Sequence, residues 1–207
     1  MTKIEYIDFI RNSLQMVDKT AKFHREQVAA AINNAVNTVF YDLYLKNPKA
    51  FRKSMERYTT FITSIPVLNA TVGRYVSTLT VDMVDLPRKA GGVLEILMPT
   101  TTTTKFIPVS TMEGEQLYGS EASLSGNVIG FSLSGNRYIE YWDLDIAETP
   151  AAGVVIRLIQ QFKSYARTDN VLLPYGQDER IMELVRQYLG LIPPKDIINT
   201  EADGQYK

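Results

Sequence analysis

The chain has 207 residues, of which 45% are hydrophobic and 22% charged, the composition of an ordinary globular protein. Its formal net charge of −1 excludes a strong electrostatic attraction to nucleic acid or to an anionic membrane. No apolar run approaches the roughly 18–20 residues that span a bilayer. The absence of cysteine excludes disulfides and thiolate chemistry, and the single histidine, His24, excludes a metal site built on two imidazoles.

Two helices are predicted at the start of the chain. Apolar residues at spacings of three and four predict a short amphipathic helix over residues 3–17 and a longer helix over residues 22–46. His24, near the start of the longer helix, is expected to be exposed or to lie in the capping region. Pro48 predicts a further helical turn that runs through Met55. The face of the longer helix expected to pack against the core consists of Val28, Ile32, Ala35, Val36, Val39 and Leu43.

The opposite face of the longer helix is poor in charge, because only Glu26 is ionised there. Small, amide and phenol side chains suit contact with another protein surface. The same pattern also fits a solvent-exposed helix face with few charges, and the residues alone leave both interpretations open. The candidate subunit-interface residues are therefore Ala30, Asn33, Asn37, Tyr41 and Tyr44.

The middle of the chain, residues 57–163, is rich in β-branched and aromatic residues and predicts five to seven short strands. Strands 128–133 and 137–142 flank Ser134-Gly135-Asn136, a sequence suited to a tight hairpin turn. The apolar run 154–162 predicts a strand in the centre of its sheet. Pro99 and Pro108 argue against a central strand around the threonine run 100–104. Residues 112–126 predict a loop with at most one helical turn around 113–118.

A last helix is predicted over residues 178–189, with Ile181, Leu184, Val185 and Tyr188 directed inward. The polar tail after it is expected to be flexible alone and to order against a partner. This order of elements predicts an α+β fold with antiparallel strand pairing. We expect a single domain over 1–207, with the β region packed on the helices or inserted between them. Its parts are a helical part at 1–56, a β-rich part at 57–163, a closing helix at 177–190 and a tail at 191–207.

No arrangement of residues predicts catalysis. The carboxylate pairs Asp82/Asp85 and Asp143/Asp145 are typical of turns, and no glycine-rich phosphate loop occurs. Two short basic clusters, around Arg52 and at Arg88-Lys89, are interpreted as solvated surface charge. The sequence therefore predicts no enzyme, no catalytic residue, no cofactor and no metal site.

Several short motifs resemble those of bacteriophage virion proteins that build the head–tail connector, especially in crAss-like phages of Bacteroides-type hosts. The similar stretches, in chain order, are 26–35 followed by Phe40, Asp85-Leu86-Pro87, the hairpin 135–141, the strand 154–162 and the closing helix 179–190. Tyr141-Trp142-Asp143 replaces the tyrosine-proline of that family, so this hairpin is expected to close differently.

The resemblance implies a structural neck protein that forms a ring below the portal, with the portal's twelvefold symmetry. Its partners would be further copies of itself, the portal protein and other neck and tail ring proteins, with transient, non-specific passage of DNA and no membrane. It would be made in the bacterial host cytoplasm and located in the virion. Alternatives are a tail-hub or tail-tube adaptor and, from another class, a monomeric ligand- or peptide-binding module around Tyr138 and Trp142.

Ring assembly needs heterologous interfaces, in which one face of a subunit meets a different face of its neighbour. The two faces of the longer helix offer such a pair. Edge strands around 100–104 and the tail are expected to add β-augmentation or arm-exchange contacts. A channel wall with little net charge would let DNA slide without holding its phosphates.

Overall fold

The computed structural model describes residues 1–17, 22–99, 104–118, 128–142, 144 and 153–191. It has helices at both ends of the described chain and strands between them, which confirms the predicted α+β class. The elements are α1 (Lys3–Val17), α2 (Arg25–Lys46), α3 (Pro48–Met55), η1 (Glu56–Tyr58), β1 (Thr60–Ser64), β2 (Val67–Asn69), β3 (Arg74–Thr78), β4 (Val93–Leu97), β5 (Lys105–Pro108), α4 (Thr111–Tyr118), β6 (Val128–Ser134), β7 (Tyr138–Trp142), β8 (Val154–Leu158), η2 (Phe162–Ser164) and α5 (Asp178–Tyr188). Within the described ranges no helix is long and apolar enough to cross a membrane.

The N-terminal helices follow the local signals closely. Helix α1 has the predicted bounds, whereas α2 begins at Arg25 because His24 is extended and its backbone N–H donates to Oε1 of Gln27 at 3.2 Å. Asn47 caps α3 by accepting a hydrogen bond from the Ala50 N–H at 3.1 Å, and Pro48 occupies the first turn. The predicted inward face of α2 is buried except for the half-buried Leu43, and Ala31 and Phe40 are buried in addition.

The strands form two sheets. The three-stranded sheet has the order β1-β8-β4, with β8 antiparallel to both neighbours. The predicted central position of this apolar strand is therefore confirmed, although it ends at Leu158 and not at Phe162. The five-stranded sheet has the order β2-β3-β7-β6-β5 and contains the predicted β6–β7 hairpin, in which Gly135 has a φ of 68°.

Two expectations about the β-rich part are corrected. Strand β5 pairs with β6 in parallel, because α4 lies between them and turns the chain back to the same direction. Helix α4 is longer than the single turn expected. Ser110 and Glu113 explain its length, since the Glu113 N–H donates to Oγ of Ser110 at 3.2 Å and the Ser110 N–H donates to the Glu113 carboxylate at 2.8 Å. This reciprocal capping stabilises the first turn.

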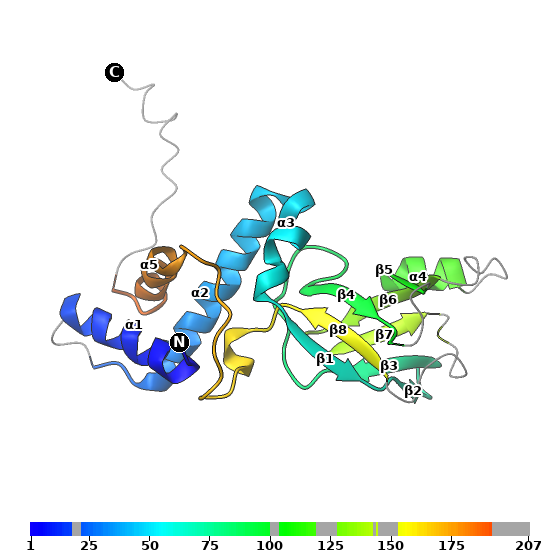
Figure 1. The fold of residues 1–207 in the computed structure, drawn as a ribbon, viewed down its shortest axis with the longest axis horizontal. Helices are drawn as coiled ribbons and strands as arrows, with labels where there is room; N and C mark the ends of the chain where they lie inside the picture. Colours follow the sequence, from blue (N-terminus) through cyan, green and yellow to red (C-terminus); the bar gives the residue numbers. More distant parts are fainter. Residues whose placement is uncertain (18–21, 100–103, 119–127, 143, 145–152, 192–207) are drawn as a thin grey trace, which may run out of the picture.

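Buried apolar side chains gather in two clusters, one among the helices and one among the strands. Figure 1 shows α1, α2 and α5 at one end of the molecule and the two sheets at the other. The β-rich part is inserted between α3 and α5 and is also packed on the helices. Five of its residues, Val84, Leu86, Leu94, Ile159 and Phe162, belong to the helical cluster. Whether both clusters unfold as one domain stays a prediction.

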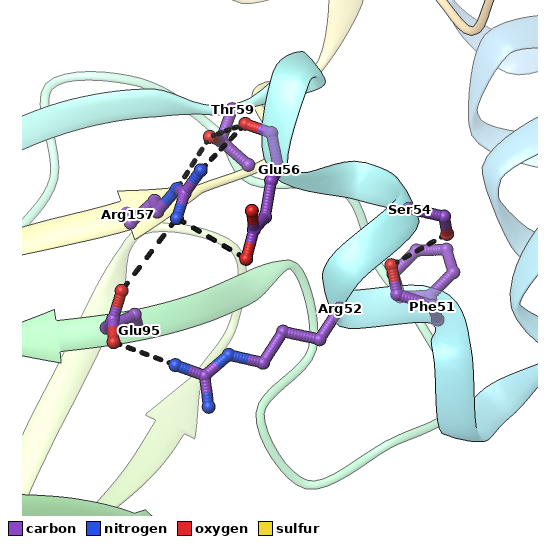
Figure 2. A network of polar contacts seen from close by, with 7 residues as sticks. All are labelled: Phe51, Arg52, Ser54, Glu56, Thr59, Glu95 and Arg157. Atoms are coloured by element: carbon purple, nitrogen blue, oxygen red, sulfur yellow. Dashed lines mark hydrogen bonds and ion pairs between the residues drawn. The ribbon is translucent and has the colours of Figure 1, made fainter.

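A polar network around Arg157 joins η1 to the three-stranded sheet (Figure 2). Its guanidinium donates to Oγ1 of Thr59 and to the backbone carbonyl of Glu56, each at 2.9 Å. The same guanidinium lies 3.9 Å from the Glu95 carboxylate, which is also bonded by Arg52 at 2.8 Å. Because the Arg157 side chain is largely buried, its hydrogen bonds are less screened than those of a surface pair.

Replacing Arg157 by alanine should lower the free energy of unfolding by about 1–3 kcal/mol, because hydrogen bonds to a charged group are removed and Glu95 is deprived of a partner. Urea denaturation followed by circular dichroism measures this change. Arg57→Ala is the matched control, because Arg57 is exposed in the same segment, and it should change stability by less than about 0.5 kcal/mol. Equal effects of the two substitutions would contradict a structural role of the network.

Candidate interaction surfaces

Two of the predicted interface residues make contacts within the chain. Oδ1 of Asn33 accepts a hydrogen bond from the backbone N–H of Lys163 at 3.0 Å, which ties α2 to η2. The ring of Tyr44 packs edge-on against Phe51 of α3, with ring centroids 5.4 Å apart. Both side chains therefore support the fold, whatever further contact they make with another molecule.

The other three predicted interface residues differ in exposure. Ala30 and Tyr41 are exposed on α2, as an interface residue must be in the free subunit. Oδ1 of Asn37 is buried and has no hydrogen-bond partner within the described part of the chain. The contact of these residues with another subunit stays a prediction.

Tyr41 belongs to a wider surface, which we call the helical apolar surface: the exposed Tyr41 and Leu45 of α2 and Tyr188 of α5, with the half-buried Thr38 between them. The three α2 residues lie at helical spacing on one stripe, and the Tyr188 hydroxyl is 2.9 Å from Oγ1 of Thr38. Tyr41 is 41% exposed and Leu45 is 55% exposed. The predicted inward position of Tyr188 is wrong, because its hydroxyl reaches Thr38 at the α2–α5 surface while Leu184 fills the core.

A second exposed apolar surface lies around β2, and we call it the β tip: Ile65, Val67, Leu68 and Val72. Among the described strands only β3 pairs with β2, so β2 is an edge of the five-stranded sheet. Val67 is 67% exposed and Leu68 is 53% exposed. Residues 59–73 contain no charged side chain, whereas exposed edge strands are usually protected by charge. Figure 1 shows β2 and α5 at opposite ends of the molecule.

Sequence reasoning missed the β tip. It placed an exposed edge at the threonine run, of which residues 100–103 lie outside the described residues. Strand β2 has only three residues and follows Pro66, so no alternating pattern marks it. The uncharged stretch 59–73 is the signal in the sequence that could have indicated this surface.

The carboxylate pairs Asp82/Asp85 and Asp143/Asp145 differ in whether the structure describes them. Asp143 and Asp145 lie outside the described residues. Asp82 is buried between the guanidinium of Arg137, which donates to it, and the Lys163 ammonium, which is 2.8 Å away. Its backbone N–H also donates to Oγ of Ser164 at 2.9 Å. These contacts assign Asp82 to holding β3, the β6–β7 turn and η2 together.

Asp82 should make stability depend on pH. The hydrogen bond from Arg137, with the charge of Lys163, lowers the pKa of the Asp82 carboxyl below its ordinary value. A lowered carboxyl pKa stabilises the fold above the unfolded-state pKa of about 4, and this contribution disappears as pH falls through the folded-state pKa.

Asp82→Asn should therefore destabilise the protein by about 1–2 kcal/mol at pH 7 and make little difference in strong acid. Urea denaturation as a function of pH measures both. Asp85→Asn provides the control, because the structure records no ion pair of Asp85 within the described ranges. If the free energies of unfolding of Asp82→Asn and the wild type differed by the same amount at every pH down to 2, this assignment would be wrong.

The side chains of Arg88 and Trp142 are both engaged in contacts within the chain. The guanidinium of Arg88 is committed to the backbone carbonyls of Gly91 and Val93. The indole of Trp142 is buried, donates to Oγ of Ser132 at 3.1 Å, and is covered by the Arg74 guanidinium 3.5 Å from the ring centroid. A ligand could stack on this ring only by displacing Arg74 or α4. The described residues contain no cluster of three or more metal-ligating side chains.

Neither a protein-family model nor a curated protein matches this chain. The resemblance to connector proteins therefore rests on the short motifs. In the α2 motif, Val28, Ile32, Ala35 and Phe40 are all buried. This motif is therefore explained by the packing of the helix in the core. Function has to be inferred from the exposed surfaces.

Proposed function

We propose that this protein is a non-enzymatic structural component of a bacteriophage virion that assembles into a ring of the head–tail connector, below the portal. The observation that carries the proposal is the pair of exposed apolar surfaces on separate parts of the chain. Exposed apolar patches of this kind mark protein–protein contacts. Two different patches on separate elements of the subunit suit a heterologous interface, which closes into a ring when the rotation between neighbours is right.

Each surface offers a different kind of contact. The edge of β2 that no described strand pairs with presents backbone N–H and C=O groups to a second chain, and Val67 and Leu68 add apolar area. The helical apolar surface presents two tyrosines, a residue type enriched at interfaces because it combines a large apolar ring with a polar hydroxyl. The motifs shared with connector proteins support the choice of a neck ring among possible assemblies.

The first test is the oligomeric state of the purified full-length chain. Light scattering and negative-stain imaging should detect a ring, and cross-linking should join it to purified portal protein. A strict monomer at high concentration that also fails to bind portal would falsify the proposal. Immunogold labelling of virions with an antibody to this protein distinguishes the two virion positions. Gold at the neck supports a connector ring, and gold at the far end of the tail supports a tail adaptor.

Charged substitutions on the two surfaces should disrupt assembly. We expect Leu68→Lys on the β tip and Leu45→Lys on the helical apolar surface each to weaken self-association at least about tenfold, because a buried unpaired charge opposes association. Sedimentation velocity over a concentration series measures this effect. Met16→Lys is the matched control, because Met16 is also an exposed apolar residue and belongs to neither surface.

Mixing the two variants tests whether the surfaces meet each other. If the β tip of one subunit contacts the helical apolar surface of the next, Leu68→Lys and Leu45→Lys subunits each keep one intact surface. The mixture should then form heterodimers and no larger species. Rings in the mixture, or the absence of heterodimers, would show that each surface meets some other partner.

A further inference from the structure

An open cavity of about 710 Å³ lies where the C-terminal half of α1 meets the start of α2. We call this region the α1–α2 corner. Arg11 and Gln15 line it from α1, and Lys22, His24, Arg25 and Glu26 line it from the beginning of α2. Residues 18–21, which join the two helices in sequence, lie outside the described residues. Three cations and one carboxylate thus line a single cavity in a protein whose net charge is slightly negative.

Two of these cations are not neutralised within the described residues. Arg25 is held by Asp8 through two hydrogen bonds of 2.9 Å. Arg11 and Lys22, in contrast, have no ion-pair partner within the described part of the chain. Nε of Arg11 is also buried without a hydrogen-bond acceptor there. Cations without a carboxylate partner attract anions, and both Arg11 and Lys22 line the cavity.

The start of α2 adds to the same effect. The backbone dipoles of a helix place partial positive charge at its N-terminus, where unpaired N–H groups attract anions. At the α1–α2 corner this end of a 22-residue helix coincides with the side chains of Arg11 and Lys22. A helix end alone does not define an anion site. Here the side-chain cations Arg11 and Lys22 add positive charge at the same place.

The basic lining continues beyond the first cavity. A neighbouring cavity of about 210 Å³ shares Arg25 and Glu26 and is lined in addition by Lys3 and Arg167. The Lys3 ammonium is partly committed, because it donates to the carbonyls of Lys163 and Tyr165 at 2.8 and 2.7 Å. Basic side chains thus line both of these adjoining cavities.

We propose that the α1–α2 corner binds phosphate groups, with Arg11 and Lys22 as the main ligands. The guanidinium of Arg11 matches the geometry of phosphate oxygens, and the Lys22 ammonium contributes a mobile point charge. The phosphate can belong to a nucleic-acid backbone or to a small phosphate-bearing molecule, because both present the same oxyanion. This site does not depend on self-association and is independent of the proposed ring.

The full-length protein is titrated with a fluorescein-labelled short DNA duplex, followed by anisotropy, and with inorganic phosphate, followed by calorimetry. The double variant Arg11→Gln/Lys22→Gln should bind at least about tenfold more weakly. The slope of its salt dependence should fall by about one unit for each phosphate that the variant no longer neutralises. The matched control is Lys53→Gln/Arg57→Gln, which removes the same charges from exposed positions outside the cavity and should bind within about twofold of wild type.

The outcomes separate the sources of the phosphate. Binding of both probes in competition supports a nucleic-acid backbone, and binding of inorganic phosphate alone supports a small ligand. Equal weakening in both double variants would mean non-specific attraction and overturn the proposal, as would no binding to the wild type. Thermal unfolding gives a second readout. Phosphate should raise the melting temperature more than chloride of equal ionic strength, and this excess should be larger for the wild type than for Arg11→Gln/Lys22→Gln, because only the wild type adds site binding to the general stabilisation by phosphate.

Discussion

Phe162→Ala should lower the free energy of unfolding by about 3–5 kcal/mol, a large fraction of the stability of a typical domain. The Phe162 ring is fully buried, 6.0 Å from the ring of Tyr6, with the Lys3 ammonium 5.6 Å from its centroid. Phe162 begins η2, which follows the central strand β8 and packs against α2. The substitution therefore leaves a cavity where the helices meet the β-rich part.

Two spectroscopic probes make this experiment informative about domain organisation. Trp142, the chain's single tryptophan, lies in β7 and reports on the β-rich part by fluorescence, whereas circular dichroism at 222 nm reports mainly on the helices. In a single domain, both probes should show the same urea midpoint, and Phe162→Ala should shift both equally. A shift of the helical signal alone would contradict the single-domain prediction. Phe9→Ala is the control, because Phe9 is half-exposed on α1, and it should cost less than about 1 kcal/mol.

Gly114→Ala should lower the free energy of unfolding by about 2 kcal/mol, although alanine is the better helix former. Gly114 lies within α4, where the change would normally stabilise a helix by about 1 kcal/mol. A Cβ at Gly114, however, would lie under 3.0 Å from three ring atoms of Trp142. Displacing the ring strains the packing by about 1–3 kcal/mol and weakens its hydrogen bond to Ser132.

Urea denaturation followed by Trp142 fluorescence measures this effect directly, because the disturbed ring is itself the probe. The emission maximum of the folded Gly114→Ala variant should also shift, since α4 no longer packs closely on the indole. Met112→Ala, on the exposed side of the same helix, should leave stability within about 0.5 kcal/mol of wild type. A more stable Gly114→Ala variant would mean that α4 moves away from Trp142 at little cost.

The elements that sequence reasoning located best are those with strong local signals. Helix α1, helix α3 and the β6–β7 hairpin were located within two residues, because helical periodicity, Pro48 and Gly135 act within a few residues of where they stand. The length of α4 was missed although its signal was also local. Ser110 and Glu113 form a capping box that could have been recognised in the sequence.

The candidate interaction surfaces could be predicted from the sequence only in part, because they combine residues from different elements. Sequence reasoning located Tyr41 correctly on an exposed face of α2. It did not place Leu45 and Tyr188 beside Tyr41. The contact between α2 and α5 depends on the packing of two helices that are far apart in sequence. Asn33 and Tyr44 look like surface residues on a helical wheel. Their partners Lys163 and Phe51 become visible only when η2 and α3 are placed against α2.

By itself, the sequence determined the α+β class, the order of the elements, the uncharged composition of residues 59–73 and the low charge of one α2 face. Only the tertiary structure decided that β2 is an unprotected edge, that β5 runs parallel to β6, and that Arg11 and Lys22 line one cavity without ion-pair partners among the described residues. The physical reason is the range of the interactions. Helix periodicity, caps and turns depend on residues within about four positions, whereas strand pairing, burial and charge neutralisation depend on residues that only the folded chain brings together.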